Sequence, residues 1–430
     1  MLSGGTFLGQ ATLIVISPVL TRMFTPAEFG VLAVFTALTS MMIVAMALRY
    51  EFAIPVCRDD DDALAMLVLC AVVTTGITLL LTVLILGYGQ QIAAIFGLHG
   101  HEDLLWLAPP SLWLWGLSLP LANWTIRRSA FRLNAGSNLA QFATQAMAQL
   151  SLGALGGGGS ALVIGYSLGP VARLALLRNA LGARDRARLT KLTPSRVWRM
   201  AREHWRYPVF SSSSSVLQSA SQMLPAVLVA ALYGPAAAGL FGLTQRILGA
   251  PVRMLSEAAS QVFLGEIARA EGPKLLRLFR RTVLVFFTAG AAGAAPLVLA
   301  GPALFALVFG ESWREAGQLV QLLVPLYLTR FVVVPVSQTL NVTGKQHYHL
   351  AASLLNALAL AASFGLGAAL DLPMNTTVLL YGLGSTASFL LYLAMAWRSA
   401  RAASRTPDPS ASSGDIRSRL NREPDEAAKP

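Results

Sequence analysis

Charged residues are scarce in this chain. Asp, Glu, Lys and Arg make up 13% of its 430 residues, whereas hydrophobic residues make up 55%. A soluble globular protein has about 25% charged residues, so this chain has too few to solvate a compact body of its size. The scarcity excludes an ordinary soluble enzyme and favours a polytopic helical membrane protein.

Cysteine is also scarce, and the familiar signatures of catalysis are missing. The only cysteines, Cys57 and Cys70, have neither a metal-ligand spacing nor the pattern of a disulfide framework. The sequence has no Walker motif, no Ser-His-Asp arrangement and no pair of carboxylates placed for hydrolysis. We therefore predict no catalytic residue, no metal and no cofactor, and we do not expect ATP to be the direct energy source.

Long apolar runs are what the sequence has instead. Hydropathy predicts an all-α polytopic membrane protein with about twelve transmembrane helices, since roughly 20 apolar residues cross the hydrocarbon core. The predicted spans are 3–23, 31–50, 63–88, 104–125, 137–156, 160–178, 210–232, 237–261, 282–300, 317–339, 350–370 and 376–397. Residues 398–430 are rich in Ser, Arg, Asp and Pro, which predicts a disordered tail.

Positive charge is distributed unevenly among the predicted loops. If the N-terminus is cytoplasmic, 26 of the 33 Lys and Arg residues lie in inside loops or the tail, and only Arg22 and Arg314 lie in outside loops. The positive-inside rule then places both termini in the cytoplasm. Topology explains the net charge of +12, so we do not expect nucleic acid as a partner.

The first hairpin contains a short motif that recurs in the second half of the chain. An aromatic residue, a proline and a glycine have the same spacing in Phe24-x-Pro26-x3-Gly30 and in Tyr233-x-Pro235-x3-Gly239. Pro26 suits a turn, and we expect Gly30 to let the second helix begin without steric cost.

The recurrence predicts two pseudo-symmetric lobes of six helices each. We assign residues 1–178 to the N-terminal lobe, 179–209 to a cytoplasmic linker, 210–397 to the C-terminal lobe and 398–430 to a cytoplasmic tail. With six spans in each lobe, both lobes start on the same side of the membrane, so they are parallel repeats, as in two-lobed transporters.

Polar side chains form stripes on the first helix of each predicted lobe. Gln10 and Ser17 lie on the first span, and Gln218 and Gln222 lie four residues apart on the seventh, on one helical face. Two interpretations stay open: hydrogen bonds between helices, or the wall of a water-filled cavity that binds substrate.

The eighth predicted span carries three charged residues on one face. Arg246, Arg253 and Glu257 are separated by seven and four residues. Each arginine facing lipid would cost roughly 2.5–3.5 kcal/mol, so we expect both to face the interior and bind substrate. Glu257 is a candidate for ion coupling, while an Arg253–Glu257 ion pair is the structural alternative.

Three further charged residues have two possible roles each. Arg330 lies between Pro325 and Pro335, where it either binds an anion or satisfies carbonyls that the prolines free. Arg49 either snorkels to the membrane surface or lies at the cavity mouth, and Glu51 is a second candidate for ion coupling. At a separation of two, Arg49 and Glu51 are not expected to face each other on a helix.

Two segments resemble a known family. Ser17–Gly30 (SPVLTRMFTPAEFG) and Arg49–Pro55 (RYEFAIP) closely resemble the polysaccharide transporter family, the Wzx-like flippases of the MOP exporter superfamily, which also contains the MATE exporters. The resemblance implies two V-shaped lobes with a cationic cavity. It also implies alternating access, coupled to an ion gradient, that moves an undecaprenyl-diphosphate-linked oligosaccharide across the bacterial inner membrane for O-antigen, capsule or exopolysaccharide synthesis.

The resemblance implies membrane lipids as partners, with a polysaccharide polymerase and chain-length proteins as further candidates. Two other functions are alternatives to the flippase function that the resemblance implies. A MATE-like exporter of cationic compounds would need cavity carboxylates, and a polymerase or ligase would be expected to have a large outside loop. The intramembrane charge here is mostly arginine, which favours an anionic pyrophosphate.

The predicted topology is testable with reporter fusions. Fusions at Gly158 and Ala237 should report an external location, and a fusion at Ser195 an internal one, because the basic loops stay in the cytoplasm. An external Ser195 would contradict both the orientation and the assignment of the linker.

Overall fold

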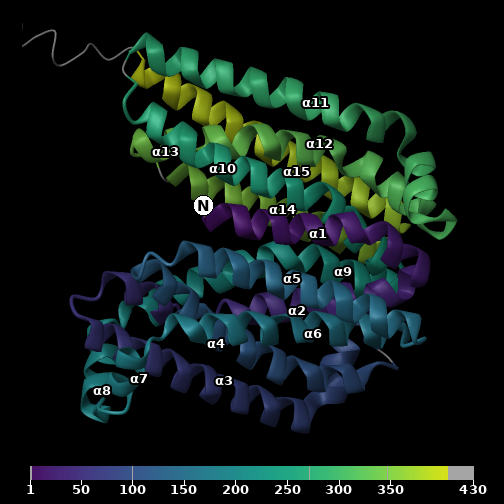
Figure 1. Cartoon of the computed structure of the whole chain (residues 1–430). Helices are drawn as coiled ribbons and strands as arrows, with labels where there is room; N and C mark the ends of the chain where they lie inside the picture. Colours follow the sequence, from purple (N-terminus) through teal and green to yellow (C-terminus); the bar gives the residue numbers. More distant parts are fainter. Residues whose placement is uncertain (1, 99, 271, 346, 405–430) are drawn as a thin grey trace, which may run out of the picture. The chain divides into compact units, whose positions relative to one another are not determined.

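The computed structural model describes residues 2–98, 100–270, 272–345 and 347–404, with residues 2–8, 95 and 217 described by their backbone alone. All regular structure in these ranges is helical (Figure 1). The long helices are α1 (Leu2–Met23), α2 (Pro26–Ile43), α3 (Asp60–Ile95), α4 (Ala108–Arg127), α5 (Phe131–Ala154), α6 (Gly158–Leu177), α9 (Ser213–Thr244), α10 (Ala250–Ile267), α11 (Pro273–Phe309), α12 (Arg314–Val336), α14 (His347–Ala369) and α15 (Met374–Ala403).

Short helical segments connect them. They are η1 (Tyr50–Val56), η2 (Glu102–Leu107), η3 (Arg178–Ala180), α7 (Ala183–Leu189), α8 (Pro194–Glu203), η4 (Tyr207–Ser212), η5 (Gln245–Gly249), η6 (Glu311–Trp313) and α13 (Gln338–Val342).

The all-α polytopic class is confirmed. Within the described residues, nine helical stretches are long and apolar enough to cross a membrane, and one of them, Tyr207–Ile267, holds two predicted spans. These two spans meet at Gly234, whose φ of 83° and ψ of 178° interrupt α9. The helices α1 and α5 cover the two predicted spans that are not among the nine.

The boundaries of the second span and of the last helix differ from prediction. The second predicted span, 31–50, corresponds to α2, which runs from Pro26 to Ile43. At the other end of the chain, α15 continues to Ala403, past the predicted start of the tail. The remainder of that tail, 405–430, lies outside the described residues.

The start of α2 is fixed by a capping box. The Glu28 N–H donates to Thr25 Oγ1 over 3.4 Å, and the Thr25 N–H donates to Glu28 Oε2 over 2.7 Å. These bonds satisfy two of the N–H groups that a helix start leaves free. Gly30 lies inside this helix, so the expectation that it lets the helix begin is wrong.

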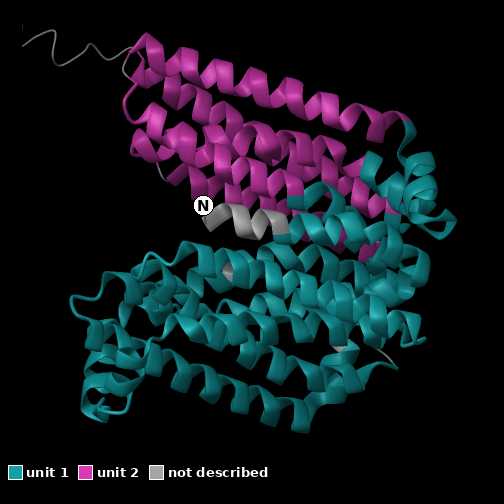
Figure 2. Cartoon of the chain, in the orientation of Figure 1, with its two compact units in different colours: residues 1–250, 300–321, 372–374 teal, residues 251–299, 322–371, 375–430 magenta. Residues whose placement is uncertain are grey.

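The chain forms two compact units (Figure 2). Unit 1 contains residues 1–250, 300–321 and 372–374, and unit 2 contains residues 251–299, 322–371 and 375–430. These units follow packing, whereas the predicted lobes follow the sequence repeat, which stays a prediction.

In unit 1, the most extensive helix contact joins α2 to α9. A side-chain carbon added at Gly30 would overlap the Pro235 carbonyl, and one added at Gly239 would overlap the Pro26 carbonyl. The proline and the glycine of each copy of the repeated motif therefore contact the glycine and the proline of the other. Only glycine permits backbones to approach so closely.

The segment 300–321 joins unit 1 through aromatic and polar contacts. The Trp313 ring lies edge-on to Phe29, with centroids 4.9 Å apart, and its Nε1–H donates to the Thr21 carbonyl over 2.9 Å. Arg22 Nη2 also donates to the Leu307 carbonyl. These contacts hold the end of α1 and the start of α2 in place.

In unit 2, the core joins the ends of α10, α11, α12 and α15. Phe263, Phe279, Val336 and Ala396 are buried in one cluster. Pro335 has no N–H, so it frees the Phe331 carbonyl, and Ser256 Oγ donates to that carbonyl over 3.4 Å. A hydroxyl group of α10 thus replaces the N–H donor that Pro335 lacks in α12.

The close contact between the repeated motifs predicts an unusual response to alanine. Gly30→Ala and Gly239→Ala should each lower the free energy of unfolding by about 1–3 kcal/mol, because the new methyl group meets backbone that cannot rotate away. Gly76→Ala in α3 is the matched control, since nothing lies within 4 Å of its added carbon and alanine favours helix.

Thermal unfolding of the three purified variants in detergent measures the difference. We expect Gly76→Ala to match or slightly exceed the wild type. Equal unfolding temperatures for Gly30→Ala and Gly76→Ala would contradict the claim that the contact between α2 and α9 leaves no room for a methyl group.

Candidate functional site

Arg246 lies on η5, a π-helical turn in unit 1. Its side chain is half-buried, its Cζ lies 5.9 Å from the centroid of the Phe29 ring, and its Nη1 is buried without a hydrogen-bond partner among the described residues. The ring contributes about 0.5–2 kcal/mol to holding the cation, which leaves much of the desolvation cost unmet. No carboxylate among the described residues forms an ion pair with Arg246, and π-helical turns are common at functional positions.

Arg253 and Arg330 both lie in unit 2. They are half-buried residues of α10 and α12, two helices that hydrogen bonds from Ser256 and Ser260 join. The ion pairs formed by described residues include none of Arg246, Arg253 and Arg330. The Arg253–Glu257 ion pair, which was the structural alternative, is thus not among the ion pairs of the described residues. Glu257 is exposed.

One carbonyl that the prolines around Arg330 free has a hydroxyl partner. Pro335 frees the Phe331 carbonyl, and Ser256 Oγ donates to it. Thr329 Oγ1 donates to the carbonyls of Pro325 and Leu326 over 2.8 and 2.9 Å, within its own helix. Among the described residues, the hydrogen bond to the Phe331 carbonyl thus comes from Ser256 and not from Arg330.

The predicted glutamines lie on α1 and α9. Gln218 and Gln222 are exposed on the part of α9 before the break at Gly234. Gln10 is half-buried, and its Oε1 has no hydrogen-bond partner among the described residues. The amides of all three therefore keep hydrogen-bonding capacity that a sugar hydroxyl could use.

Arg49 and Glu51 do face each other, so the expectation from their spacing is wrong. Arg49 Nη1 lies 3.8 Å from Glu51 Oε1. The prediction assumed an α-helix, but Leu48 and Arg49 have φ values of 47° and 62°, and the helix that follows is the 3-10 segment η1. Consecutive left-handed residues are strained, and such strain is concentrated at functional positions.

One half-buried arginine was missed as a candidate by the sequence interpretation. Arg173 on α6 donates from Nη1 to Gln141 Oε1 over 3.2 Å and lies over the Trp115 ring, while its Nε is buried without a partner among the described residues. It follows Gly165 and Gly169 at a spacing of four, on the face that contacts α5. That spacing was visible in the sequence and marks Arg173 as interior.

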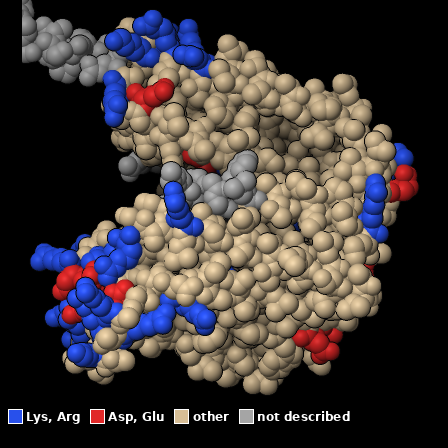
Figure 3. Space-filling model, in the orientation of Figure 1, with Lys and Arg blue, Asp and Glu red and all other residues tan. Residues whose placement is uncertain are grey.

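Arginines of the connecting segments are paired instead. Arg196 of α8 bonds to Asp62 over 2.8 Å and to Asp59 over 3.0 Å, and Arg127 bonds to Asp60. Figure 3 shows this mixture of charges over α7 and α8. A hydrogen bond from the Asp62 N–H and the charge of Arg196 lower the pKa of Asp59. Arg246, Arg253 and Arg330 differ from these arginines in lying half-buried within predicted spans without an ion pair among the described residues, which keeps them as ligand candidates.

The family of the chain follows from its sequence. The family model described as "Polysaccharide biosynthesis protein" matches residues 19–318. The chain belongs to this polysaccharide biosynthesis family. A search of the curated proteins finds no match.

Solved structures resemble this member of the polysaccharide biosynthesis family in fold. An inward-facing MATE multidrug resistance transporter of the MOP superfamily has a TM-score of 0.68 at 13% identity, with 93% of this chain and 96% of that chain covered. The lipid II flippase MurJ, in an inward closed conformation, has a TM-score of 0.65 at 11% identity, with 99% and 93% covered. A MOP superfamily transporter from Pyrococcus furiosus, whose binding pocket is described as reversed in polarity, has a TM-score of 0.59 at 13% identity, with 94% and 96% covered. The chain is thus a multi-pass membrane protein with a MOP-type fold.

The Arg49–Glu51 pair predicts a specific pH dependence. Burial raises the pKa of the Glu51 carboxyl above its usual 4.5, although the Arg49 charge opposes the shift. The folded state therefore favours the neutral acid, and this stabilisation is present at low pH and lost as pH rises through the folded pKa. Glu51→Gln, which mimics the neutral acid, should remove that loss.

Unfolding temperatures between about pH 4 and pH 8 measure the effect. The wild type should lose stability relative to Glu51→Gln as pH rises. Glu311→Gln is the control with the opposite sign, because Arg314 lowers the pKa of the exposed Glu311. Parallel curves for wild type and Glu51→Gln would disprove the assignment.

Proposed function

We propose that this chain is a flippase that moves an undecaprenyl-diphosphate-linked oligosaccharide from the inner to the outer leaflet of the bacterial inner membrane. The oligosaccharide would serve the synthesis of O-antigen, capsule or exopolysaccharide. The polysaccharide biosynthesis family and the MOP-type fold support a membrane flippase or exporter. The observation that carries the choice of substrate is Arg246, a half-buried residue whose Nη1 is buried without a hydrogen-bond partner among the described residues.

A diphosphate supplies what this arginine lacks. Guanidinium groups bind phosphate oxygens through two parallel hydrogen bonds, and such charge-assisted bonds are stronger than those between neutral groups. The unpaired Nη1 of Arg246 is a free donor for one of them. Arg253 and Arg330, on the adjacent helices α10 and α12, are two further cations that suit the same kind of ligand.

The remaining predicted residues suit the sugars and the coupling step. The amides of Gln10, Gln218 and Gln222 both donate and accept hydrogen bonds, as sugar hydroxyls do. Glu51 and Glu257 are the carboxylates proposed to respond to an ion gradient. The polyprenyl tail would stay in the lipid, since moving so much apolar surface into water is unfavourable.

Alternating access is the proposed mechanism, with both termini in the cytoplasm. The repeated motif supports it, because parallel repeats that rock about a shared contact open a central path to each side in turn. A polysaccharide polymerase and chain-length proteins are the proposed partners that receive the product.

A MATE-like exporter of small molecules is the second candidate, favoured by the similarity to MATE transporters in fold. A site for cationic compounds would use carboxylates as its main charged groups. Here the unpaired charges are arginines, whereas Glu51 is paired with Arg49 and Glu257 is exposed. The charge of the site therefore favours the anionic lipid-linked sugar over the cationic compound.

Arginine substitution tests the proposal in a strain that lacks the chromosomal copy. Arg246→Ala should lower glycan export by about tenfold or more while membrane abundance stays near normal, because the diphosphate loses a charge-assisted contact. Arg246→Lys should retain part of the activity, since it keeps the charge but not the paired geometry. Lipid-linked oligosaccharide should accumulate in the inner leaflet.

Arg314→Ala is the matched control. Arg314 is an exposed arginine paired with Glu311, so its loss should leave export unchanged. Full complementation by both Arg246→Ala and Arg246→Glu would rule out an anion site at this position.

A further inference from the structure

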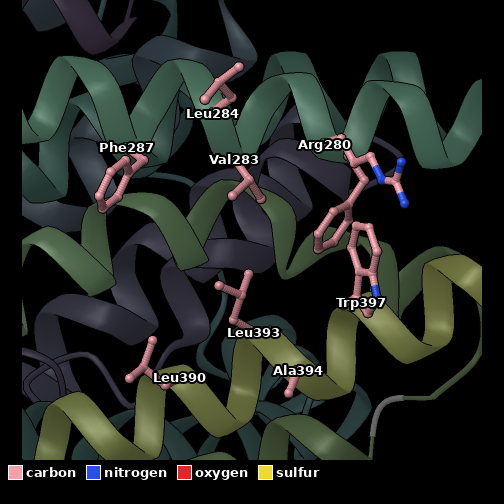
Figure 4. A pocket seen from close by; sticks show the side chains of 9 residues that line it. Arg280, Val283, Leu284, Phe287, Leu390, Leu393, Ala394 and Trp397 are labelled. Atoms are coloured by element: carbon pink, nitrogen blue, oxygen red, sulfur yellow. The ribbon is translucent and has the colours of Figure 1, made fainter.

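A groove runs between α11 and α15 in unit 2, with a volume of about 410 Å³ (Figure 4). Val283 and Leu284 line it from α11, and Leu393 and Ala394 line it from α15. The surface of the groove is almost entirely carbon, so it offers a polar solute nothing to bind. Its occupant must be apolar over most of its length.

One end of the groove differs from the rest. Arg280 and Trp397 lie there, with the Arg280 Cζ 4.9 Å from the centroid of the Trp397 ring, and Phe287 and Leu390 lie at the other end (Figure 4). Arg280 is exposed, and no described carboxylate forms an ion pair with it. The ring therefore orients a cation that remains free to bind an anion.

Basic residues predominate around this end of α11, and Glu266 at the end of α10 is the exposed carboxylate nearest in the chain among the described residues. Lys274, Arg277 and Arg281 are exposed on the same end of α11. A phosphate near Arg280 would thus meet several cations, and each basic residue near a membrane surface contributes about 1 kcal/mol to attraction of anionic lipid. A zwitterionic headgroup carries its own cation, which this cluster would repel.

The groove is placed to receive a lipid. The most apolar stretch of α11 is not buried inside the protein, so in a membrane it faces hydrocarbon. Arg280 and Phe287 are seven residues apart, which corresponds to roughly 10 Å along a helix. Tryptophan and arginine are typical of the membrane interface, where a headgroup meets its chains.

We propose that this groove binds an anionic phospholipid, with the phosphate on Arg280 and one acyl chain along Val283, Leu393 and Phe287. The arrangement pairs a single cationic end with a single apolar channel, which is the chemistry of a phospholipid headgroup and chain. The site uses none of the arginines assigned to transport, so it does not rest on the proposed function.

Native mass spectrometry of the purified full-length protein with added phosphatidylglycerol or phosphatidylcholine tests the proposal. The wild type should retain phosphatidylglycerol in preference. Arg280→Gln removes the cation and should lower its occupancy by about tenfold. Ala394→Trp fills the groove at an exposed position and should have a comparable effect.

Matched controls come from the same helix. Arg277→Gln removes an exposed basic residue outside the groove lining, and Val285→Trp adds bulk at a position that is 51% exposed and does not line the groove. Val285→Trp should bind phosphatidylglycerol nearly as the wild type does, and Arg277→Gln should lose clearly less than Arg280→Gln, because it removes one cation of the surrounding surface but not the cation that lines the groove. Thermal unfolding of each variant identifies any that fails to fold. If either Arg280→Gln or Ala394→Trp does not fold, the other of these two variants tests the proposal.

Three outcomes would overturn the proposal. The first is equal retention by wild type, Arg280→Gln and Ala394→Trp. The second is equal loss in the groove variants and the controls, which would indicate a diffuse charge effect. The third is displacement of phosphatidylglycerol by an undecaprenyl diphosphate lipid that needs Arg280, which would make the groove a site for the cargo tail instead. None of these measurements involves transport, so they leave the flippase proposal untouched.

Discussion

Where α2 crosses α9, two backbones lie so close that no side-chain carbon fits between them. Gly30 contacts the Pro235 carbonyl, and Gly239 contacts the Pro26 carbonyl. Phe29 precedes one of these glycines, and Arg246 follows the other by seven residues, about two helical turns. Because the crossing fixes both helices, it also fixes the contact between the Arg246 cation and the Phe29 ring. The candidate site in unit 1 therefore depends on a packing constraint that involves no charge.

Hydropathy was sufficient to predict the helical class and the location of the spans, because a run of about 20 apolar residues has few alternatives in a membrane. The repeated motif was also visible in the sequence. The packing role of Gly30 was not visible in the sequence. Its partner lies about 200 residues away, and no local pattern reports a contact at that separation. The capping box of Thr25 and Glu28, in contrast, was a local signal that could have placed the start of α2 at Pro26.

The candidate site shows the same division between local and distant information. Offsets along one helix predicted that Arg246 and Arg253 face the interior, and the structure shows both half-buried. Such offsets could not predict that the helices of Arg253 and Arg330 lie side by side, because that depends on how α10 packs against α12. The Arg49–Glu51 pair was missed because it requires left-handed backbone at two non-glycine residues, which no helix-based rule anticipates. Arg173 was missed although its spacing from Gly165 and Gly169 was readable.

The proposed transport of an anion poses a particular electrostatic problem for a protein. Its binding cations must stay unpaired to bind cargo, yet an unpaired cation away from water destabilises the fold. Arginines of the connecting segments and Arg246 differ in their partners. Arg196 and Arg199 of α8 and Arg127 at the end of α4 are paired with carboxylates of Asp59–Asp62, whereas the described contact of Arg246 is an aromatic ring. The cost of leaving Arg246 unpaired has to be offset elsewhere, and the closest backbone packing in unit 1 occurs two turns away, at Gly239. Tight packing beside an unsatisfied charge is the expected arrangement when the missing partner is a ligand that comes and goes.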